Sequence, residues 1–364
     1  MTELAITQYF AYWRIIELGD REILEGLVAR AHEEPSPALA QCIADWDGYH
    51  YWQTAPEGRW LVLVRERVAP RERWWLHAAL LILTLLTTTI GGAALAGAAG
   101  LWYHPSFSDL RAGLPFALPL LAILLAHESG HYMTARRYRV NASPPFFIPF
   151  PSQWNILGTM GAFIRLRSPV FDRRTLFDIG VAGPLAGMIV AIPVLLIGLA
   201  LSTAAPGGPT LPLSHQFLRF DNGYIFVGDS LLMLLGRAVL GLGGAVELHP
   251  LAMAGWVGIL VTSLNLLPMA QFDGGHIAYA MFGRRQIWVA RAFWLSLLLL
   301  GRFWIGWWVW AVLALLIGRG RLGHPRLIDS ERGLDARRRL LGWIGVVMFV
   351  LTLMPQPWFL AFPS

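Results

Sequence analysis

Several long stretches of this chain contain no charged residue. From residue 74 until past Tyr103 there is no Asp, Glu, Lys or Arg, and a helix of this length exceeds the ~30 Å hydrocarbon core of a bilayer. Charged residues make up 14% of the 364 residues, whereas soluble domains carry about 25%. We therefore expect lipid to surround most of the folded chain, which requires backbone groups to be paired within helices.

The apolar segments predict an all-α polytopic membrane protein with about seven transmembrane helices. The predicted spans are residues 75–101, 114–136, 177–202, 251–282, 287–301, 303–318 and 340–360. The fourth span is too long for one straight crossing and contains Pro268. We expect its helix to be broken or kinked there, because proline removes a backbone hydrogen bond.

Arginines between these spans set a consistent topology. The net charge is +6, and the chain contains no lysine. The arginine-rich segments are residues 65–73, 136–139, 165–174, 284–291 and 319–339. Seven crossings that start inside place all five segments on the cytoplasmic side, as the positive-inside rule requires. Membrane topology thus accounts for the basic charge, and we expect no nucleic-acid partner.

The chain divides into three predicted regions. Residues 1–74 have ordinary soluble composition and include a strand-like segment at 59–68, so we expect a small cytoplasmic N-terminal domain. Residues 75–285 form the membrane core, and residues 286–364 form C-terminal membrane helices that could be a lid, an oligomer interface or filler. The N-terminus lacks a signal-peptide pattern. We expect an integral protein of a prokaryotic cytoplasmic membrane, in an oligomeric state that the sequence does not fix.

The second predicted span contains the motif H-E-x-x-H. Its histidines, His127 and His131, are four residues apart, so they share one helix face and can both reach one zinc ion. Glu128 lies beside them and can take a proton from a zinc-bound water. Cys42 is the only cysteine, which leaves His, Asp and Glu as the metal ligands. The alternative is a pair of packing histidines beside a neutral glutamate, although an unpaired carboxylate in a membrane is costly.

The fourth predicted span supplies a candidate third ligand. Asp273 is the acid in its interior, beyond the break at Pro268, and irregular backbone at membrane depth lines protein or a wet cavity. Asn265 could donate a hydrogen bond to a developing oxyanion, or could instead make a polar contact between helices. His276 is interpreted as a supporting or interfacial residue and not as a ligand.

Together these motifs resemble the site-2 protease family of intramembrane zinc metalloproteases, peptidase family M50. The residues that carry the resemblance are His127-Glu128-Ser129-Gly130-His131, Asn265-x-x-Pro268-x-x-x-x-Asp273-Gly274 and the segment Gly180-Val-Ala-Gly183-Pro184-Leu-Ala-Gly187. The resemblance covers roughly residues 112–285. It implies one zinc ion per chain on His127, His131 and Asp273, with Glu128 as the base. No PDZ domain is inserted between the core spans, so the layout resembles the PDZ-free members.

Two further segments adjoin these motifs. Residues 141–170 are rich in proline and glycine, and we interpret them as a membrane-associated β-hairpin. Its part at 156–166 could capture an unwound transmembrane substrate by β-augmentation, or could be an interfacial loop. The glycines of the third span are interpreted as packing residues, because small residues let helices approach closely.

The sequence therefore predicts a zinc metalloendopeptidase that hydrolyses peptide bonds of membrane-protein substrates within or near the bilayer. Its partners would be a transmembrane protein substrate and membrane lipid. One alternative is a metal transporter, which would show internal repeats and polar residues along several spans. The other is a catalytically silent chaperone or scaffold of the same fold, which should lack Glu128 or a ligand.

Overall fold

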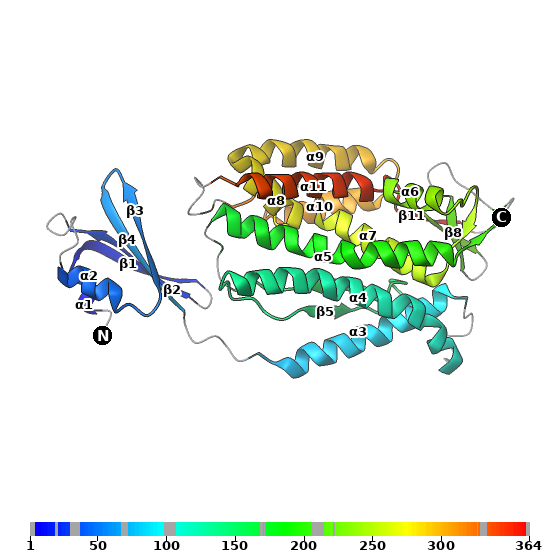
Figure 1. Ribbon diagram of the computed structural model, residues 1–364, viewed down its shortest axis with the longest axis horizontal. Coiled ribbons are helices and arrows are strands. Elements are labelled where there is room, and N and C mark those ends of the chain that lie inside the picture. Colours follow the sequence, from blue (N-terminus) through cyan, green and yellow to red (C-terminus); the bar gives the residue numbers. More distant parts are fainter. Residues whose placement is uncertain are drawn as a thin grey trace. The chain divides into compact units, whose positions relative to one another are not determined.

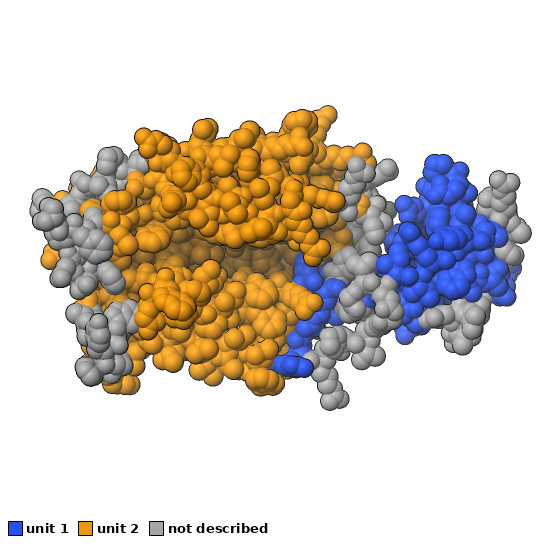
Figure 2. Space-filling model, turned by 180° about the vertical axis from the view of Figure 1, so that it is seen from behind, with its two compact units in different colours: residues 1–73, 140–142, 166–169 blue, residues 74–139, 143–165, 170–364 orange. Residues whose placement is uncertain are grey.

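The fold consists of two compact units. The computed structural model describes residues 4–18, 21–29, 37–66, 72–97, 107–167, 170, 172–205, 208, 215–220, 223–325, 327 and 333–361. Residues 1–73, 140–142 and 166–169 form unit 1, and residues 74–139, 143–165 and 170–364 form unit 2 (Figure 2).

Unit 1 is built on an antiparallel sheet. Its elements are α1 (Leu4–Thr7), β1 (Phe10–Leu18), β2 (Arg21–Val28), α2 (Pro37–Ala44), β3 (Tyr49–Ala55) and β4 (Gly58–Glu66), with strand order β1-β2-β4-β3. Leu61 and Leu63 on β4 belong to one hydrophobic cluster and Val62 and Val64 to another, because alternate residues of a strand face opposite sides and both sides are covered here. The strand predicted at 59–68 is confirmed as β4, which ends at Glu66.

Three helices of unit 2 are long and apolar enough to cross a membrane. They are α3 (Trp74–Leu95), α4 (Phe107–Arg137) and α5 (Arg173–Ala200), at the first three predicted spans. The first span ends at Leu95, short of the predicted boundary, and residues 98–101 of the prediction lie outside the described residues.

The remaining helices are shorter, so seven crossings are not confirmed. They are α6 (Leu231–Val239), α7 (Pro250–Asn265), α8 (Asp273–Phe282), η2 (Gly283–Arg285), α9 (Gln286–Leu300), α10 (Gly306–Ile317) and α11 (Ala336–Thr352). The longest of them, α11, has 17 residues. In the last predicted span, 340–360, the helix ends at Thr352, and the chain forms a strand from Trp358 onward.

The predicted break at Pro268 is confirmed. α7 ends at Asn265, the chain turns through Ala270 with φ of 49°, and α8 begins at Asp273. Gly274 allows this close turn, since a Cβ there would lie 2.0 Å from the carbonyl oxygen of Leu266. The break therefore places Asp273 at the first turn of a new helix.

The all-α prediction describes the helices of unit 2 but misses a five-stranded sheet. Its strands are β7 (Thr203–Ala204), β8 (Gln216–Phe220), β9 (Gly223–Val227), β10 (Val246–Glu247) and β11 (Trp358–Ala361), in the order β11-β9-β8-β10-β7. The sheet lies at one end of the unit 2 helices (Figure 1). It forms because β11 returns from beyond α11 to pair with β9, a contact between segments far apart in the sequence.

The predicted hairpin in 141–170 is confirmed. β5 (Phe146–Pro149) pairs antiparallel with β6 (Thr159–Phe163), and Phe146 lies opposite Phe163 with stacked rings. Thr87 of α3 donates a hydrogen bond to the carbonyl of Gly158 at 2.6 Å, which attaches the hairpin to the helices. The hairpin therefore belongs to the same packed unit as α4, whose side chains form the site described next.

Candidate metal centre

Two histidines of α4 face the same point inside unit 2. His127 and His131 are 3% and 6% exposed, and their Nε2 atoms lie 3.1 Å apart. The spacing of four residues places them on successive turns of one helix face. Residues around them, including the fully buried Phe116 and Leu120 of the same helix, form the main hydrophobic core.

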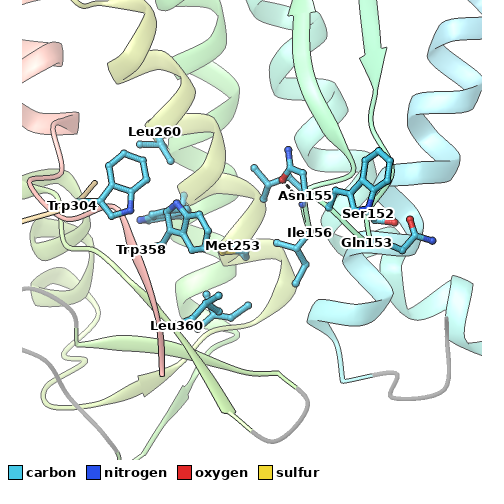
Figure 3. A pocket seen from close by; sticks show the side chains of 13 residues that line it. Ser152, Gln153, Asn155, Ile156, Met253, Leu260, Trp304, Trp358 and Leu360 are labelled. Atoms are coloured by element: carbon cyan, nitrogen blue, oxygen red, sulfur yellow. Dashed lines mark hydrogen bonds between the residues drawn. The ribbon is translucent and has the colours of Figure 1, made fainter. Parts of the chain in front are cut away.

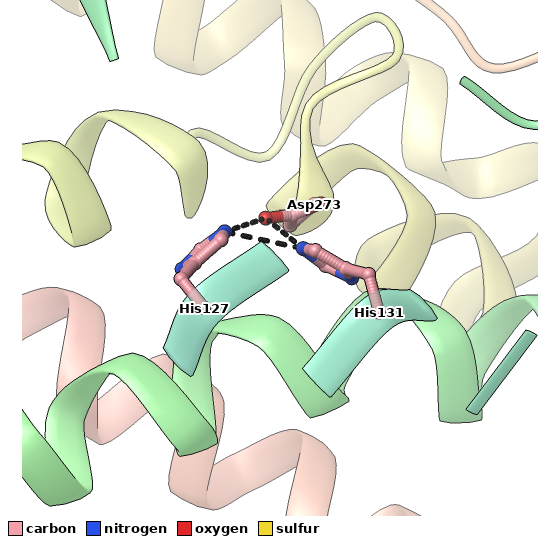
Figure 4. Close-up of side chains that lie close together, drawn as sticks. All are labelled: His127, His131 and Asp273. Carbon is pink, nitrogen blue, oxygen red and sulfur yellow. Dashed lines mark hydrogen bonds and ion pairs between the residues drawn. The ribbon is translucent and has the colours of Figure 1, made fainter. Parts of the chain in front are cut away.

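Asp273 completes a cluster of three donors. Its Oδ2 atom lies 3.2 Å from Nε2 of His127 and 3.2 Å from Nε2 of His131. Figure 4 shows the carboxylate pointing at both imidazoles from the start of α8. The structure thus brings together the three ligands predicted from the sequence, although His131 and Asp273 are 142 residues apart along the chain.

The donor geometry fits a single tetrahedral metal ion. Ligand atoms held at about 2.0–2.1 Å by a tetrahedral zinc ion lie about 3.3 Å from one another, close to the observed spacings of 3.1 and 3.2 Å. Nδ1 of His131 contacts the carbonyl oxygen of Ile179 at 2.7 Å, so this nitrogen donates and Nε2 keeps its lone pair for a metal. Three protein ligands leave one position for water.

Glycines of α5 make room for the two imidazoles. A Cβ at Gly183 would lie 2.0 Å from Nε2 of His131, and one at Gly187 would lie 3.2 Å from Nδ1 of His127. The interpretation of these glycines as packing residues was therefore incomplete. They adjoin the ligands themselves, and a side chain at Gly183 would displace the imidazole of His131.

Glu128 is buried next to the ligands. Glu128 is 6% exposed, and the strand β6 packs against α4, the helix that carries Glu128. The hairpin therefore helps to cover the helix that holds the candidate base, whose burial is costly while its charge is unpaired.

Asn265 lies at the metal-facing edge of the cluster. As the last residue of α7, it places Nδ2 at 3.1 Å from Nε2 of His127. The amide is thus close enough to the donors to contact a group bound between them. The break after α7 is what brings Asn265 and Asp273 to the same place.

His276 does not join the cluster. Its ring packs at 73° against His324, with centroids 4.9 Å apart. Sequence reasoning missed His324, Gln286 and the carbonyl of Ile179 as neighbours of the site. No spacing pattern indicates these contacts, because each joins segments that are distant along the chain.

Comparisons with known proteins agree with this arrangement. The family model described as "Peptidase family M50" matches residues 115–299, which is half of the chain and includes every residue of the cluster. No solved structure matches.

Three curated relatives illustrate the similarity. The protein named "Probable zinc metalloprotease EGY1, chloroplastic" from Arabidopsis thaliana is 36% identical over 253 residues, covering 67% of this chain and 43% of the relative. Its namesake from Oryza sativa subsp. japonica is 38% identical over 179 residues, 48% of this chain and 29% of the relative. "Probable zinc metalloprotease EGY2, chloroplastic" from Arabidopsis thaliana is 31% identical over 251 residues, 68% of this chain and 43% of the relative.

This chain spans less than half the length of these relatives. The predicted location in a prokaryotic cytoplasmic membrane gains no support from them, since their names place them in chloroplasts. The apolar helices and the matched family support the coarser statement that this is a membrane protein. With the family model matched across the three clustered donors, this chain belongs to peptidase family M50.

Proposed function

We propose that this chain is an intramembrane zinc metalloprotease that hydrolyses peptide bonds of membrane-protein substrates within or near the bilayer. The observation that carries the proposal is the convergence of His127, His131 and Asp273 beside the buried carboxylate of Glu128. The relatives' names, which contain the words zinc metalloprotease, support zinc as the metal.

Each residue of the site has a chemical task in this proposal. His127, His131 and Asp273 would hold the zinc ion. When bound, zinc lowers the pKa of a water ligand toward ~7 and polarises the scissile carbonyl. Glu128 accepts the proton of the attacking water and then passes it to the leaving amine. Asn265 donates a hydrogen bond to the carbonyl oxygen as this oxygen gains negative charge.

The hairpin offers a place for an extended substrate. A protease needs an unwound segment, since a helix uses its carbonyls in internal hydrogen bonds. β5 and β6 form a sheet of only two strands among the described residues, so β6 retains an edge to which a substrate strand could add. Because β6 packs against α4, the helix that carries Glu128, a segment paired along 156–166 would run near the base.

An apolar groove supports the idea that a transmembrane segment is accommodated nearby. A cavity of about 690 Å³ lies between the tip of the hairpin, at Trp154 and Ile156, and α7, at Trp256 and Leu260 (Figure 3). Figure 2 shows a long hollow across this unit. Leu260 is five residues before Asn265 on α7, so the groove follows the helix that ends at the metal centre.

Topology completes the proposal. Seven crossings with a cytoplasmic N-terminus would place the arginine-rich ends of α4 and η2 on the cytoplasmic side. His131 lies six residues before Arg137, the last residue of α4. Water could therefore reach the metal centre from the cytoplasm, and the product would be released there during regulated intramembrane proteolysis.

The test is cleavage of a single-pass model substrate by purified protein in detergent. Wild type and Glu128→Gln are compared, with zinc content measured for both. We expect about one zinc per chain in each protein and a loss of cleavage of at least about 100-fold in the variant, because proton transfer contributes that much. Equal cleavage by both proteins would contradict the proposed mechanism. Zinc binding without cleavage of any substrate by the wild type would favour the silent scaffold.

A further inference from the structure

A second cavity in unit 2 is lined in part by Tyr279 of α8, the helix that begins at Asp273. It has a volume of about 620 Å³ and is bordered by η2, α9 and the residues after α10. Three of its lining residues are arginines, Arg284, Arg291 and Arg321, and Tyr279 and Gln286 also line it. Neither the metal centre nor the groove beside the hairpin shares a lining residue with it.

The charged side chains that line this cavity are all positive. Among the described residues that line it there is no carboxylate. Within the described part of the chain, none of the three arginines lies within ion-pair distance of an acid, whereas Arg338 and Arg65 each have such a partner. Three guanidinium groups around one cavity repel one another, and an anion between them would offset that repulsion.

The wall of the cavity also offers a neutral hydrogen-bond donor, the hydroxyl of Tyr279. Tyr279 is 4% exposed, and its hydroxyl oxygen accepts a hydrogen bond from the backbone N–H of Leu327 at 3.4 Å. The hydroxyl proton therefore remains available to donate. Arginine presents several N–H groups in a fixed fork, which suits the oxygens of a phosphate group better than a single point charge does.

The surroundings indicate where such a phosphate would come from. α9 and α10 expose large apolar side chains outward, with Trp288, Leu299 and Leu316 between 66% and 75% exposed. The guanidinium of Arg291 lies 5.1 Å from the ring centroid of Trp288. Tryptophan beside arginine at the end of an apolar helix is typical of the membrane interface, where lipid headgroups lie.

The wall of the cavity is attached to the segment between α7 and α8. The backbone N–H of Ala270 donates to the carbonyl of Leu322 at 2.7 Å. Gln286, 1% exposed, donates to the carbonyl of Pro268 at 3.2 Å and accepts from the backbone N–H of His324 at 3.1 Å. An anion held by the arginines would thus stabilise the residues that support the start of α8.

We propose that this cavity binds a phosphate group, presented by the headgroup of an anionic phospholipid. The arginines supply the charge-assisted hydrogen bonds, Tyr279 supplies a neutral donor, and the outward apolar faces of α9 and α10 take the acyl chains. The site does not depend on the proteolytic activity proposed above.

The experiment measures lipid binding to the purified full chain in a neutral detergent. Dihexanoyl-phosphatidylglycerol and dihexanoyl-phosphatidylcholine are titrated separately, and the apparent Kd is read from the change in thermal stability. The test variant is Arg284→Gln/Arg291→Gln/Arg321→Gln. The matched control is Arg285→Gln/Arg302→Gln/Arg319→Gln, which removes the same charge from arginines that do not line the cavity.

We expect the wild type and the control to bind phosphatidylglycerol at least about tenfold more tightly than the test variant does, because charge-assisted hydrogen bonds are lost. Phosphatidylcholine should not bind comparably. Inorganic phosphate is then added as a competitor: displacement at millimolar concentration would keep the phosphate site but assign it to free phosphate. Equal binding of both lipids by the wild type would overturn the proposal even if the test variant failed to fold. Equal affinity of a folded test variant would overturn it as well.

Discussion

Two pairs of histidines in unit 2 have nearly the same ring geometry and different surroundings. The rings of His127 and His131 have centroids 4.8 Å apart at 73°, and those of His276 and His324 are 4.9 Å apart at 73°. In the first pair both Nε2 atoms approach the carboxylate of Asp273. In the second pair, Nδ1 of His324 contacts the carbonyl oxygen of Pro325 at 2.6 Å, and no carboxylate joins the two rings in a cluster among the described residues.

Neighbouring imidazoles alone therefore do not make a metal site. A zinc site needs at least three donor atoms that converge on one point. In the described part of the chain, the first pair has such a third donor, Asp273, and the second pair has none. Three pairs of substitutions test this contrast and are given from the largest expected effect to the smallest.

The largest effect is expected when one member of each pair is removed. His131→Ala should lower the zinc content from about one ion per chain to below about 0.1 and abolish cleavage, because two ligands do not retain zinc. His324→Ala should keep its zinc. Elemental analysis of both purified proteins gives the answer. A zinc-free His324→Ala protein would mean that the second pair also takes part in metal binding.

A smaller effect is expected from Asn265, whose amide nitrogen lies beside an imidazole ring of the first pair. Asn265→Ala should lower kcat by about 10²- to 10³-fold with the zinc content unchanged, since an oxyanion donor is lost. The matched control is Ser263→Ala on the same helix, whose buried hydroxyl has no hydrogen-bond partner among the described residues. If Asn265→Ala lowers the melting temperature and leaves kcat intact, the amide is a polar contact between helices.

The smallest effect compares the glycines that face the two pairs. Gly183→Ala would press a methyl group against His131, and we expect zinc affinity to fall by about 10- to 100-fold, as when the support of a ligand is disturbed. Gly180→Ala would place its Cβ 3.0 Å from the Cβ of His276, so zinc affinity should change little. Competition with a zinc chelator measures both. An equal loss in the two variants would show that helix packing, and not the imidazole, determines the effect.

The residues at the centre of the candidate site could be predicted because their chemistry is local or nearly so. His127 and His131 share one helix face with Glu128 beside them. Pro268 predicts the helix break that precedes Asp273. The hairpin was predictable from its prolines and glycines. In each case a short run of residues determines the feature, so one sequence is sufficient.

The parts that escaped prediction depend on pairing between distant segments. β7 and β10 have two residues each, too short for an alternating pattern to be recognised. The apolar residues up to 360 continue the pattern of α11, so the predicted span extends beyond Thr352. In the structure the helix ends before Pro355 and Pro357, and β11 follows these prolines. Asp221-Asn222-Gly223 between two apolar runs was a usable hairpin signal for β8 and β9.

The hydrogen bond between Nδ1 of His131 and the carbonyl of Ile179 has a mechanical consequence. It joins a candidate ligand on α4 to the backbone of α5, and one helical turn of sliding between the two helices, about 5.4 Å, would break this contact of 2.7 Å. The tautomer of His131 would then no longer be fixed. Retention of a bound zinc ion would therefore report on the alignment of α4 and α5, two helices that are long and apolar enough to cross a bilayer.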